Sequence, residues 1–589
     1  MTTAGGEIIK KLEDITRDAA RHQSETLRYI LEHNGGVSYL RRYLGSYNEP
    51  VDADTFRTAV PLSRYEDYAD YINKMADGVL TDENDGGRPL LSVDPLICFF
   101  YSSGTSSMKP KLIPYFDSKP AKEVSAMAHQ GSFANVGRLF PPRPSVNKAL
   151  WFLYAGNVAE TKGGYKAMAA TSSLLHNDPK GSNSSRLLAA CISPREVILG
   201  TDVEQQMYCH LLCGLRNSDL IDSIRAPYAS GLARAFRLLE AKWEKMCEDL
   251  ENGFPAAEIT DAAMRESVAE ILSGPRPDLS NKFRVILREK SWEGIVRKLW
   301  PNVGYVRCIT TGTMLQYYEK LGYYAGDVPL LGGDYFSSEC CIGLNFDVMK
   351  PPELTRYTVI PSAAYFEFLP FDMDTCCCSG SGTLELSSVR VGEFYELIVT
   401  TYRGFYRYRL GDIVKVVGHY NSSPQLEFVM RAPKTSGDIV TERDLMSAMG
   451  LFRVAVRDVL SAEVTDFTSS FDLEAEPNRL KIFLELKDGC ALLQKEKSGE
   501  VEMIRMKLRK CCSRLEDDLG GIYKVMKARG EVSSLLLSVV QPGSFDSLLE
   551  IAVEKGVPAT QYKAPKILRD CKLVEFLEMS AIMTLTADS

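Results

Sequence analysis

The sequence predicts a mixed α/β fold, with a large N-terminal domain of β-sheets and flanking helices and a small α+β C-terminal domain. The chain has 589 residues, which is too long for a single hydrophobic core. Strand-like apolar runs and amphipathic helix patterns alternate along it. A stretch with few apolar residues, 431–444, interrupts these patterns. We therefore expect a large domain at 1–430, a hinge linker at 431–444 and a small domain at 445–589.

Composition and charge argue against nucleic-acid and membrane partners. The formal net charge is −8, so no basic field is present to attract nucleic acid. The N-terminus lacks the apolar segment of a secretory signal, and no apolar run reaches the roughly 18 residues of a membrane span. The 15 cysteines are odd in number and scattered, which is typical of a reducing compartment. We expect a cytoplasmic protein.

Helices are predicted near the N-terminus and in the middle of the chain. Residues 7–34 predict one amphipathic helix, because apolar residues from Ile8 to Ala19 recur every three or four positions. Gly35 follows as a helix stop. A helical hairpin is expected over 223–252, where a similar apolar stripe is typical of core packing.

Short strands dominate the rest of the large domain. Strand patterns occur at 96–101, 305–309, 328–331, 365–369, 395–402, 412–417 and 425–430. The close spacing of the last four predicts an antiparallel barrel or sheet.

The small domain shows an alternating order of elements. After the linker come a strand at 480–486, a charged helix at 495–519, a strand at 535–540 and a helix beginning at Ser544. This β-α-β-α order predicts a small α+β domain.

The first candidate site is the loop after the strand at 96–101, with the sequence SSGTSSMKPK. Hydroxyls, a glycine and backbone N–H groups after a strand suit a phosphate, and a lysine adds positive charge. The P-loop pattern is absent. Taken alone, an ordinary Ser/Gly loop is the better interpretation of this stretch.

Two further stretches combine carboxylates with other polar groups. In 333–345, Glu339 stands beside two serines and is of the type that holds Mg²⁺ together with phosphate oxygens. In 401–412, Asp412 can accept both hydroxyls of a ribose, and Arg409 suits a phosphate. The alternatives are a solvated strand-end turn for the first stretch and a cross-strand Tyr/Arg face for the second.

Two shorter stretches complete the set. QYKAPK near the C-terminus contains Lys563, which can neutralise charge on a transferring phosphate, although a solvated basic loop is the alternative. TTGTMLQ supplies a turn at Thr311 and Gly312 after a strand. The histidines show no metal spacing, and His210 is interpreted as a core residue. The cysteine triplet 376–378 is interpreted as a surface loop rather than a metal site.

In the order SSGTSSMKPK, TTGTMLQYY, YFSSE and YRLGD, these stretches resemble the Gretchen Hagen three acyl-acid amido synthetases of plants, a branch of the adenylate-forming superfamily. The resemblance also covers SWEGIVRKLWPN, YFEFLP, YCHLLCGL and QYKAPK. It implies the firefly luciferase-like architecture of that superfamily. It also implies the reaction: a carboxylic acid attacks ATP to give an acyl-adenylate and pyrophosphate, and an amino acid then displaces AMP to leave an amide.

The resemblance assigns expected roles to the residues that match the family's motifs. Glu339 is implied to hold Mg²⁺ or the nucleotide, and Lys563 to lie near the α-phosphate as the catalytic lysine of the small domain. The implied nucleotide-binding residues are Ser102, Ser103, Gly104, Thr105, Lys111, Thr311, Gly312, Tyr335, Ser337, Ser338, Arg409 and Asp412. The implied acyl-binding residues are Met168, Ala170, Thr171, Met314 and Tyr335. ATP and Mg²⁺ are the expected cofactors, and a monomer is the expected state.

The chain departs from the family pattern in ways that leave alternatives open. Met108 stands where the family has a second glycine, and the linker after residue 430 is shorter. A catalytically weakened acyl- or nucleotide-binding homologue is therefore the second hypothesis, and transfer to coenzyme A is a distant third. Met168 stands where auxin-class members have an arginine, yet SSECCIGLNFDVMKPPEL resembles the auxin class. We expect indole-3-acetic acid as the acid, with jasmonate as the alternative.

Overall fold

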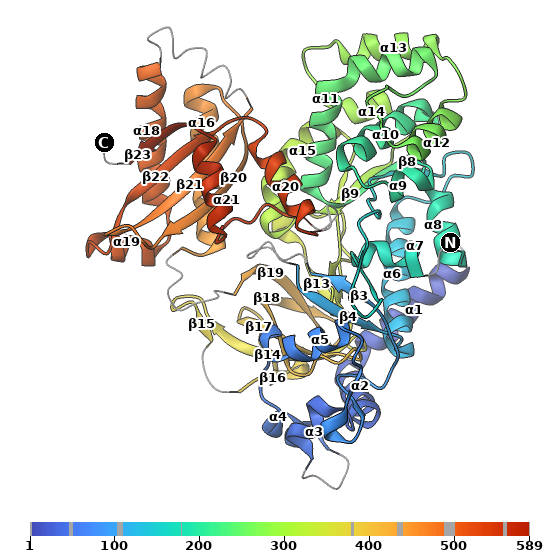
Figure 1. Cartoon of the computed structure of the whole chain (residues 1–589), viewed down its shortest axis with the longest axis vertical. Coiled ribbons are helices and arrows are strands. Elements are labelled where there is room, and N and C mark those ends of the chain that lie inside the picture. The colour runs from blue at the N-terminus through green and yellow to red at the C-terminus, as the bar shows by residue number, and fades with distance from the viewer. Residues whose placement is uncertain are drawn as a thin grey trace. The chain divides into compact units, whose positions relative to one another are not determined.

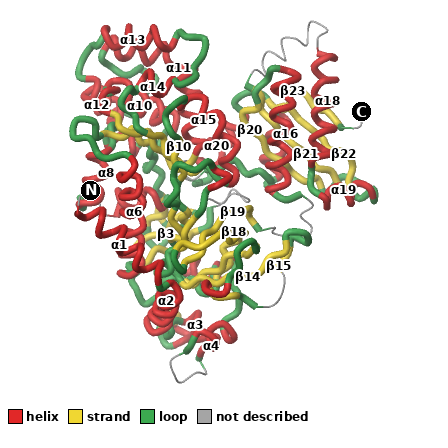
Figure 2. The backbone as a smooth tube through the Cα atoms, turned by 180° about the vertical axis from the view of Figure 1, so that it is seen from behind, coloured by secondary structure: helices red, strands yellow, loops and turns green. Residues whose placement is uncertain are grey.

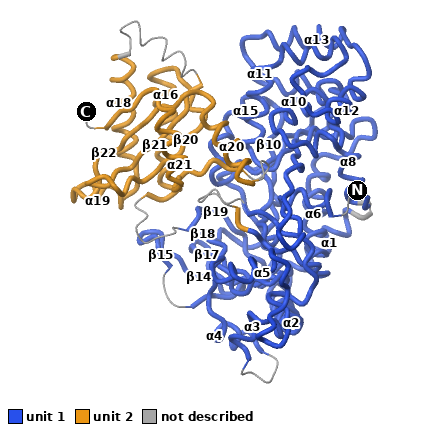
Figure 3. Tube along the Cα trace, viewed as in Figure 1, with its two compact units in different colours: residues 1–102, 112–432 blue, residues 103–111, 433–589 orange. Residues whose placement is uncertain are grey.

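The computed structural model describes residues 3–45, 51–102, 110–177, 180–378, 382–432, 440–487, 501–557 and 562–587 (Figure 1). The chain divides into two compact units (Figure 3). Unit 1 comprises Met1–Ser102 and Leu112–Ala432, and unit 2 comprises Ser103–Lys111 and Pro433–Ser589. Helices and strands mix within each unit, so the predicted mixed α/β class is confirmed (Figure 2).

Two helices stand where one was predicted at the N-terminus. The helix α1 (Thr3–Arg17) ends at a break, and α2 (Ala19–Asn34) begins after Asp18, whose backbone is not helical at φ −128° and ψ 55°. The first amide of α2 donates to Ser422 Oγ at 3.0 Å, and that hydroxyl donates to the Thr16 carbonyl at 2.9 Å. The single-helix prediction is wrong because a residue about 400 positions away supplies partners for the broken turn.

The remaining helices before the first large sheet are short. They are α3 (Ser38–Leu44), α4 (Ala53–Ala59) and α5 (Ala69–Ala76). After them, β3 (Leu96–Tyr101) has the predicted bounds and pairs with β4 (Leu112–Phe116) and β7 (Lys166–Met168), and β6 (Ala159–Glu160) completes this four-stranded sheet.

A second sheet of four parallel strands lies in the middle of unit 1. Its order is β10 (Leu330–Gly332), β9 (Tyr305–Ile309), β8 (Ile221–Tyr228) and β5 (Lys148–Trp151). Helices pack around it to form one apolar core. They include α10 (Val203–Arg216), α11 (Ala229–Asn252), α12 (Ala262–Leu272), α13 (Pro277–Leu287), α14 (Ile295–Leu299) and α15 (Tyr318–Ala325). The helix α6 (Lys119–Leu139) instead contributes Met127 and Ala128 to the apolar core that contains the residues of β3.

The helical hairpin predicted over 223–252 is wrong in its first part. Residues up to Tyr228 belong to β8, and a single helix, α11, follows. Because β8 is hydrogen-bonded to a strand on each side in a parallel sheet, Ile221 and Ile224 are both fully buried and no simple alternation marks the strand.

His210 is a core residue, as predicted. It lies on α10 without measurable exposure. Its Nε2 donates to the Leu153 carbonyl at 3.0 Å, so its Nδ1 accepts from the Ser193 hydroxyl at 2.7 Å. Burial lowers the pKa of His210 to about 4, and the ring therefore stays neutral.

The predicted cluster of short strands forms a nine-stranded sheet. Along its path lie β11 (Tyr335–Phe336), β12 (Cys341–Leu344), β13 (Tyr357–Val359), β19 (Ser423–Arg431), β18 (Tyr408–Tyr420), β17 (Phe394–Thr400), β14 (Tyr365–Asp372) and β15 (Cys377–Cys378), and β16 (Leu384–Glu385) pairs with β14. All the pairings are antiparallel. The cysteine triplet is thus partly a strand, although Cys377 is exposed as a surface position would be.

Unit 2 contains a sheet with helices on both faces. Its strands are β20 (Val464–Asp472), β21 (Asn478–Leu486), β22 (Val532–Val540) and β23 (Ala581–Thr586), in that order. The helices are α16 (Glu442–Leu460), α18 (Val501–Asp518), α19 (Gly521–Ala528), α20 (Ser544–Glu554) and α21 (Cys571–Met579). Residues Ile482 and Phe483 face two different apolar clusters, which places one group of helices on each side.

The two edge strands of unit 2 and its first helix were not predicted. The strand β20 contains Thr465, Asp466, Thr468 and Ser469, all buried, so the apolar alternation that signals a strand is missing. The helix α16 begins at Glu442, so the last three residues of the predicted linker are helical. Residues 433–439 of that linker lie outside the described residues.

None of the helices in the described ranges combines the length and the apolar character that crossing a bilayer requires.

Candidate active site

Two of the predicted stretches meet at the end of β3. Ser338 Oγ donates to the carbonyl of Tyr101, the last residue of β3, at 3.4 Å. Ser102 follows directly, so the start of the predicted phosphate loop lies beside the serines of the second stretch. Ser103, Gly104, Thr105 and Met108 lie outside the described residues. Lys111 is half-buried and precedes β4.

Asp412 and Tyr335, from two different stretches, are hydrogen-bonded. Tyr335 Oη donates to Asp412 Oδ2 at 2.5 Å, and Arg431 Nη1 lies 2.7 Å from Asp412 Oδ1. Asp412 on β18 and Arg431 on β19 are direct cross-strand partners, which fixes this ion pair. Asp412 is only 4% exposed, so the site holds a buried carboxylate with one partner on each oxygen.

The protonation state of Tyr335 follows from this surrounding. Burial, together with the negative charge of Asp412, raises the pKa of Tyr335 well above its ordinary value. The phenol therefore remains a donor at neutral pH, and Asp412 accepts.

The Thr311–Gly312 turn joins the same cluster through aromatic rings. Thr311 Oγ1 and Tyr357 Oη are 2.8 Å apart, and the rings of Tyr357 and Tyr335 lie 5.3 Å apart between centroids. Gly312 has φ +60°, and a Cβ added there would lie 3.0 Å from the ring of Phe428. The turn thus needs glycine both for its backbone and for its close approach to the sheet.

Glu339 lies in a tight turn that its neighbours hold. Ser337 Oγ donates to the Cys340 carbonyl at 3.1 Å and accepts from the Cys340 amide at 3.1 Å. Glu339 is half-buried, and loss of solvent raises the pKa of its carboxyl, against the opposing effect of the Arg431 charge. A cavity of about 20 Å³, the size of one water, is lined by Glu339 and Arg403 among others.

The donor set at Glu339 fits a magnesium ion only together with a nucleotide. No group of three or more His, Cys, Asp or Glu side chains suited to a metal occurs among the described residues. Mg²⁺ keeps much of its water and binds through one or two carboxylates plus phosphate oxygens. One carboxylate beside two serine hydroxyls is compatible with that mode.

A network next to Tyr335 was missed by sequence reasoning. Asp334 Oδ2 accepts from Arg307 Nη2 at 2.7 Å and also pairs with Ser132, while its Oδ1 accepts from the Asn345 amide at 3.0 Å. These contacts tie the residue before Tyr335 to α6, β9 and the segment after β12. The only sequence signal is an aspartate after a buried strand, which is common in turns.

Arg409 is engaged within the large sheet. Its Nε donates to Glu396 Oε1 at 3.0 Å, its Nη2 pairs with the other oxygen of that carboxylate, and Cys378 Sγ lies 3.4 Å from Nη2. This bidentate pair holds the pKa of Arg409 above its ordinary value. The geometry matches the cross-strand alternative for this residue.

The predicted acyl-binding residues are spread over two cores. Met168 ends β7, is fully buried and lies opposite Phe100 on β3. Ala170 and Thr171 follow in a short 3₁₀ turn, with Thr171 exposed. Met314 is buried in the core around the parallel sheet. The Met168 segment thus flanks the strand that leads to the phosphate loop.

Lys563 belongs to unit 2 and is half-buried. Lys566, in the same QYKAPK stretch, is buried and ion-paired with Asp466, which sequence reasoning did not identify. The available signal was an aspartate, Asp466, among the hydroxyl residues of β20.

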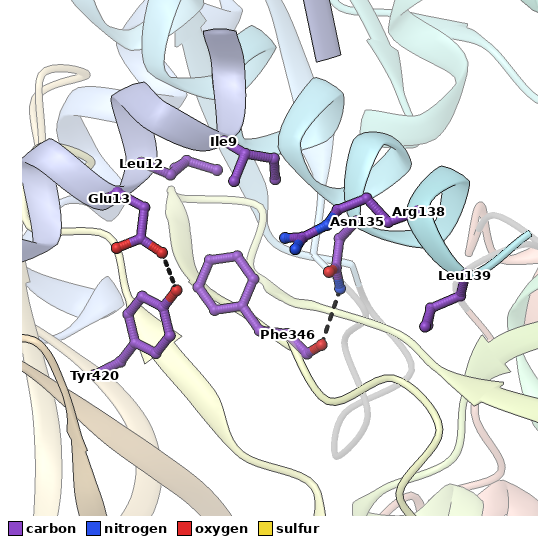
Figure 4. A pocket seen from close by; sticks show the side chains of 8 residues that line it. All are labelled: Ile9, Leu12, Glu13, Asn135, Arg138, Leu139, Phe346 and Tyr420. Atoms are coloured by element: carbon purple, nitrogen blue, oxygen red, sulfur yellow. Dashed lines mark hydrogen bonds between the residues drawn. The ribbon is translucent and has the colours of Figure 1, made fainter. Parts of the chain in front are cut away.

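One sizeable cavity contains none of the predicted site residues. It has a volume of about 390 Å³ and is lined by Ile9, Leu12, Glu13, Asn135, Arg138, Leu139, Phe346 and Tyr420 (Figure 4). Tyr420 Oη donates to Glu13 there, and Asn135 Nδ2 donates to the Phe346 carbonyl at 3.0 Å. Because no predicted phosphate- or acyl-binding residue lines this cavity, we do not assign it to the reaction.

Comparison with known proteins gives family matches along most of the chain. Models described as the GH3 family N-terminal, central and C-terminal domains match residues 8–330, 357–431 and 443–572.

Curated relatives and a solved structure agree with these matches. A probable indole-3-acetic acid-amido synthetase of Oryza sativa subsp. japonica is 46% identical over 395 residues, covering 65% of this chain and 79% of the relative. A jasmonoyl–L-amino acid synthetase of Nicotiana attenuata is 35% identical over 588 residues, covering 98% of this chain and 96% of the relative. The structure of an acyl acid amido synthetase superposes with a TM-score of 0.84 at 30% identity, covering 99% of this chain and 97% of that one.

Proposed function

This chain belongs to the GH3 family, and on that premise we propose that it is an ATP-dependent ligase that joins a plant-hormone carboxylic acid to an amino acid. Relatives of this chain are named as amido synthetases for indole-3-acetic acid and for jasmonate. The observation that best supports the proposal is the convergence of separate sequence stretches on one cluster, at the Tyr335–Asp412 hydrogen bond.

The proposed reaction has two steps. First, an oxygen of the acid attacks the α-phosphorus of ATP, the bond to the bridging oxygen breaks, and pyrophosphate leaves with an acyl-adenylate formed. Second, the amino group of the amino acid attacks the acyl carbon, AMP leaves with the oxygen that had bound phosphorus, and the amine loses a proton. Both steps depend on positioning and charge neutralisation more than on a protein nucleophile.

In this proposal the described residues divide the work. Asp412 accepts the ribose hydroxyls, since it is a fixed, buried acceptor. Ser102, Ser337 and Ser338 bind phosphate oxygens, and Lys563 supplies positive charge to the α-phosphate. The loop residues Ser103, Gly104 and Thr105 keep their proposed phosphate role, with Lys111 as a further cation.

Glu339 is the residue that would hold Mg²⁺, which when bound neutralises charge on the phosphates. Burial raises the pKa of Glu339, and the charge of a bound cation would act in the opposite direction. Arg409 belongs to the proposed nucleotide-binding set, and its guanidinium is paired with Glu396 in this structure.

The proposal also specifies which carboxylic acid is the substrate. We propose indole-3-acetic acid, with jasmonate as the second candidate, bound against Met168, Ala170, Thr171, Met314 and Tyr335. The relative with 46% identity is named for indole-3-acetic acid, while a relative that spans nearly the whole chain is named for jasmonate. A cytoplasmic location and a monomeric state complete the proposal. The free thiols of all described cysteines support a reducing compartment.

A matrix of acids against amino acids, assayed by pyrophosphate release, tests the proposal. We expect continued pyrophosphate release only when both an acid and an amino acid are present. The rate should be highest with indole-3-acetic acid. Binding of acid or nucleotide without turnover in any cell of the matrix would favour the weakened homologue. Turnover only with coenzyme A would replace the proposal with thioester formation.

A further inference from the structure

A buried lysine, Lys566, lies three residues after Lys563 in unit 2. It is 1% exposed, its Nζ donates to Asp466 Oδ1 at 2.7 Å and to the Phe467 carbonyl at 2.9 Å, and Nζ lies 4.4 Å from the centroid of the Phe467 ring. Burying an ammonium is costly unless it is paired and hydrogen-bonded, and here it is both. A solvated basic loop, which was the alternative interpretation of this stretch, would not require such a site.

The main chain around Lys566 is also bound to β20. The amide and the hydroxyl of Ser469 donate to the Lys566 carbonyl at 2.8 and 2.7 Å, and the Leu568 amide donates to the Ser469 carbonyl at 2.6 Å. Thr468 Oγ1 donates to the Pro565 carbonyl at 2.5 Å. Residues 565–568 therefore extend the sheet at the edge formed by β20, with Ile567 paired to Ser469 in parallel.

These two sets of contacts hold Lys566 at two points along β20. Its carbonyl is bound at Ser469, while its ammonium reaches back to Asp466 and Phe467. Main-chain hydrogen bonds alone specify register weakly, because every residue except proline offers the same donor and acceptor. A slip by one residue would put Pro565 or Ile567 in place of the lysine and break the buried ion pair between Lys566 and Asp466.

We propose that Lys566 is a positioning residue for Lys563, because it fixes the register of this segment against β20 and so the place from which the Lys563 side chain extends. The inference rests on the proposed role of Lys563 in adenylation. Charge neutralisation of a phosphate is sensitive to displacements of about 1 Å, which can cost on the order of a hundredfold in rate. A register slip would move Lys563 by about 3.3 Å, the rise of one residue in a strand.

Steady-state kinetics of two single variants and their combination test the proposal. Lys566→Met keeps the length of the side chain but removes the charge, and we expect it to lower kcat about tenfold or more with the KM for ATP within about threefold. In the Lys563→Ala background the same change should lower kcat no further, because the group it positions is gone. Losses that multiply, or a Lys566→Met kcat equal to that of the unaltered protein, would overturn the proposal.

A matched control separates positioning from general destabilisation. Lys527 forms a partly buried ion pair with Glu516 at 2.5 Å in the same unit, outside the segment that contains Lys563. Lys527→Met removes a Lys–carboxylate pair whose lysine is more exposed, and we expect it to lower the thermal midpoint while kcat stays within about twofold. A loss of kcat as large as that of Lys566→Met would indicate that any damage to unit 2 has this effect.

Hydrogen exchange on the full chain tests the anchoring itself, independently of turnover. We expect Lys566→Met to speed amide exchange at Ser469 and Leu568 while leaving the centre of β22 unchanged. Equal protection in both proteins would overturn the anchoring. If the protein shows no turnover with any acid, the proposed function is refuted. The hydrogen-exchange result would still test whether Lys566 anchors residues 565–568 on β20. If Lys566→Met does not fold, Asp466→Asn, which keeps the shape and removes the partner charge, provides the same comparisons.

Discussion

At the scale of single residues, the Asp412 carboxylate is the best-defined element of the candidate site. Its two oxygens are bound by Tyr335 and Arg431, which come from different strands of the large sheet. Sequence analysis identified Asp412 and Tyr335 separately, but nothing local in the sequence indicates that the phenol and the carboxylate meet. That contact depends on the order of the strands in the sheet, in which β12, β13 and β19 lie between β11 and β18. This order joins segments that are far apart in the sequence.

Removing the phenol tests the role of this contact. Tyr335→Phe keeps the ring but leaves Asp412 Oδ2 without its donor, so we expect a KM for ATP about tenfold higher, equivalent to about 1.4 kcal/mol. The control is Tyr357→Phe, which removes the contact with Thr311 and keeps the tilted contact between the rings of residues 335 and 357. A KM for ATP unchanged in Tyr335→Phe would remove the carboxylate from the nucleotide site.

Gly312 allows a test of stability at the same site. Gly312→Ala forces a side chain into the left-handed region at φ +60° and brings its Cβ to 3.0 Å from Phe428. We expect the free energy of unfolding of unit 1 to fall by about 1–3 kcal/mol. Urea denaturation, followed by a spectroscopic signal from unit 1, measures this change. Gly322→Ala, at a helical glycine with open space around its Cβ position, is the control and should leave stability unchanged or raise it. Equal effects would mean that the turn tolerates a side chain.

At the scale of elements, the strands with a clear apolar pattern could be predicted, whereas many of the other strands and the helix boundaries could not. The strand β3 has its predicted bounds because apolar β-forming residues end at a run of serines. The break between α1 and α2 was missed, since the amide of Ala19 finds its partner in Ser422 on a distant hairpin. The strand β20 was missed because its buried side chains are hydroxyls and an aspartate that other segments satisfy.

The contact between α1 and the same hairpin predicts a pH dependence. Hydrogen bonds from Tyr420 and Asn421 hold the pKa of Glu13 below its ordinary value. A carboxyl whose pKa is lower in the folded state stabilises the fold above the unfolded pKa, and that stabilisation disappears as the pH falls through the folded pKa. Glu13→Gln should therefore be less stable than the unaltered protein at pH 7 and nearly equal to it at about pH 3, by chemical denaturation. Glu7→Gln, at an exposed position of the same helix, should show no such difference at either pH. If Glu13→Gln remains less stable than the unaltered protein at low pH, the loss of stability comes from the changed shape of the side chain and not from its charge.

At the scale of the whole molecule, the chain is a GH3 family protein of two compact units. The fold class and the family could be predicted from the sequence, because the motifs occur in a fixed order and need no three-dimensional information. The acid preference could not be derived in the same way. It depends on how Met168, Met314 and their neighbours shape a pocket, and two of the expected acyl residues are already buried in separate cores.

The proposed reaction activates the acid as an adenylate before the amide forms. The most direct test uses acid labelled with ¹⁸O in its carboxylate, with ATP and an amino acid, and mass spectrometry of the nucleotide product. We expect one labelled oxygen in each AMP, because the carboxylate oxygen that attacks the α-phosphorus leaves with it. Formation of the amide with unlabelled AMP, or with labelled inorganic phosphate and ADP, would contradict the account.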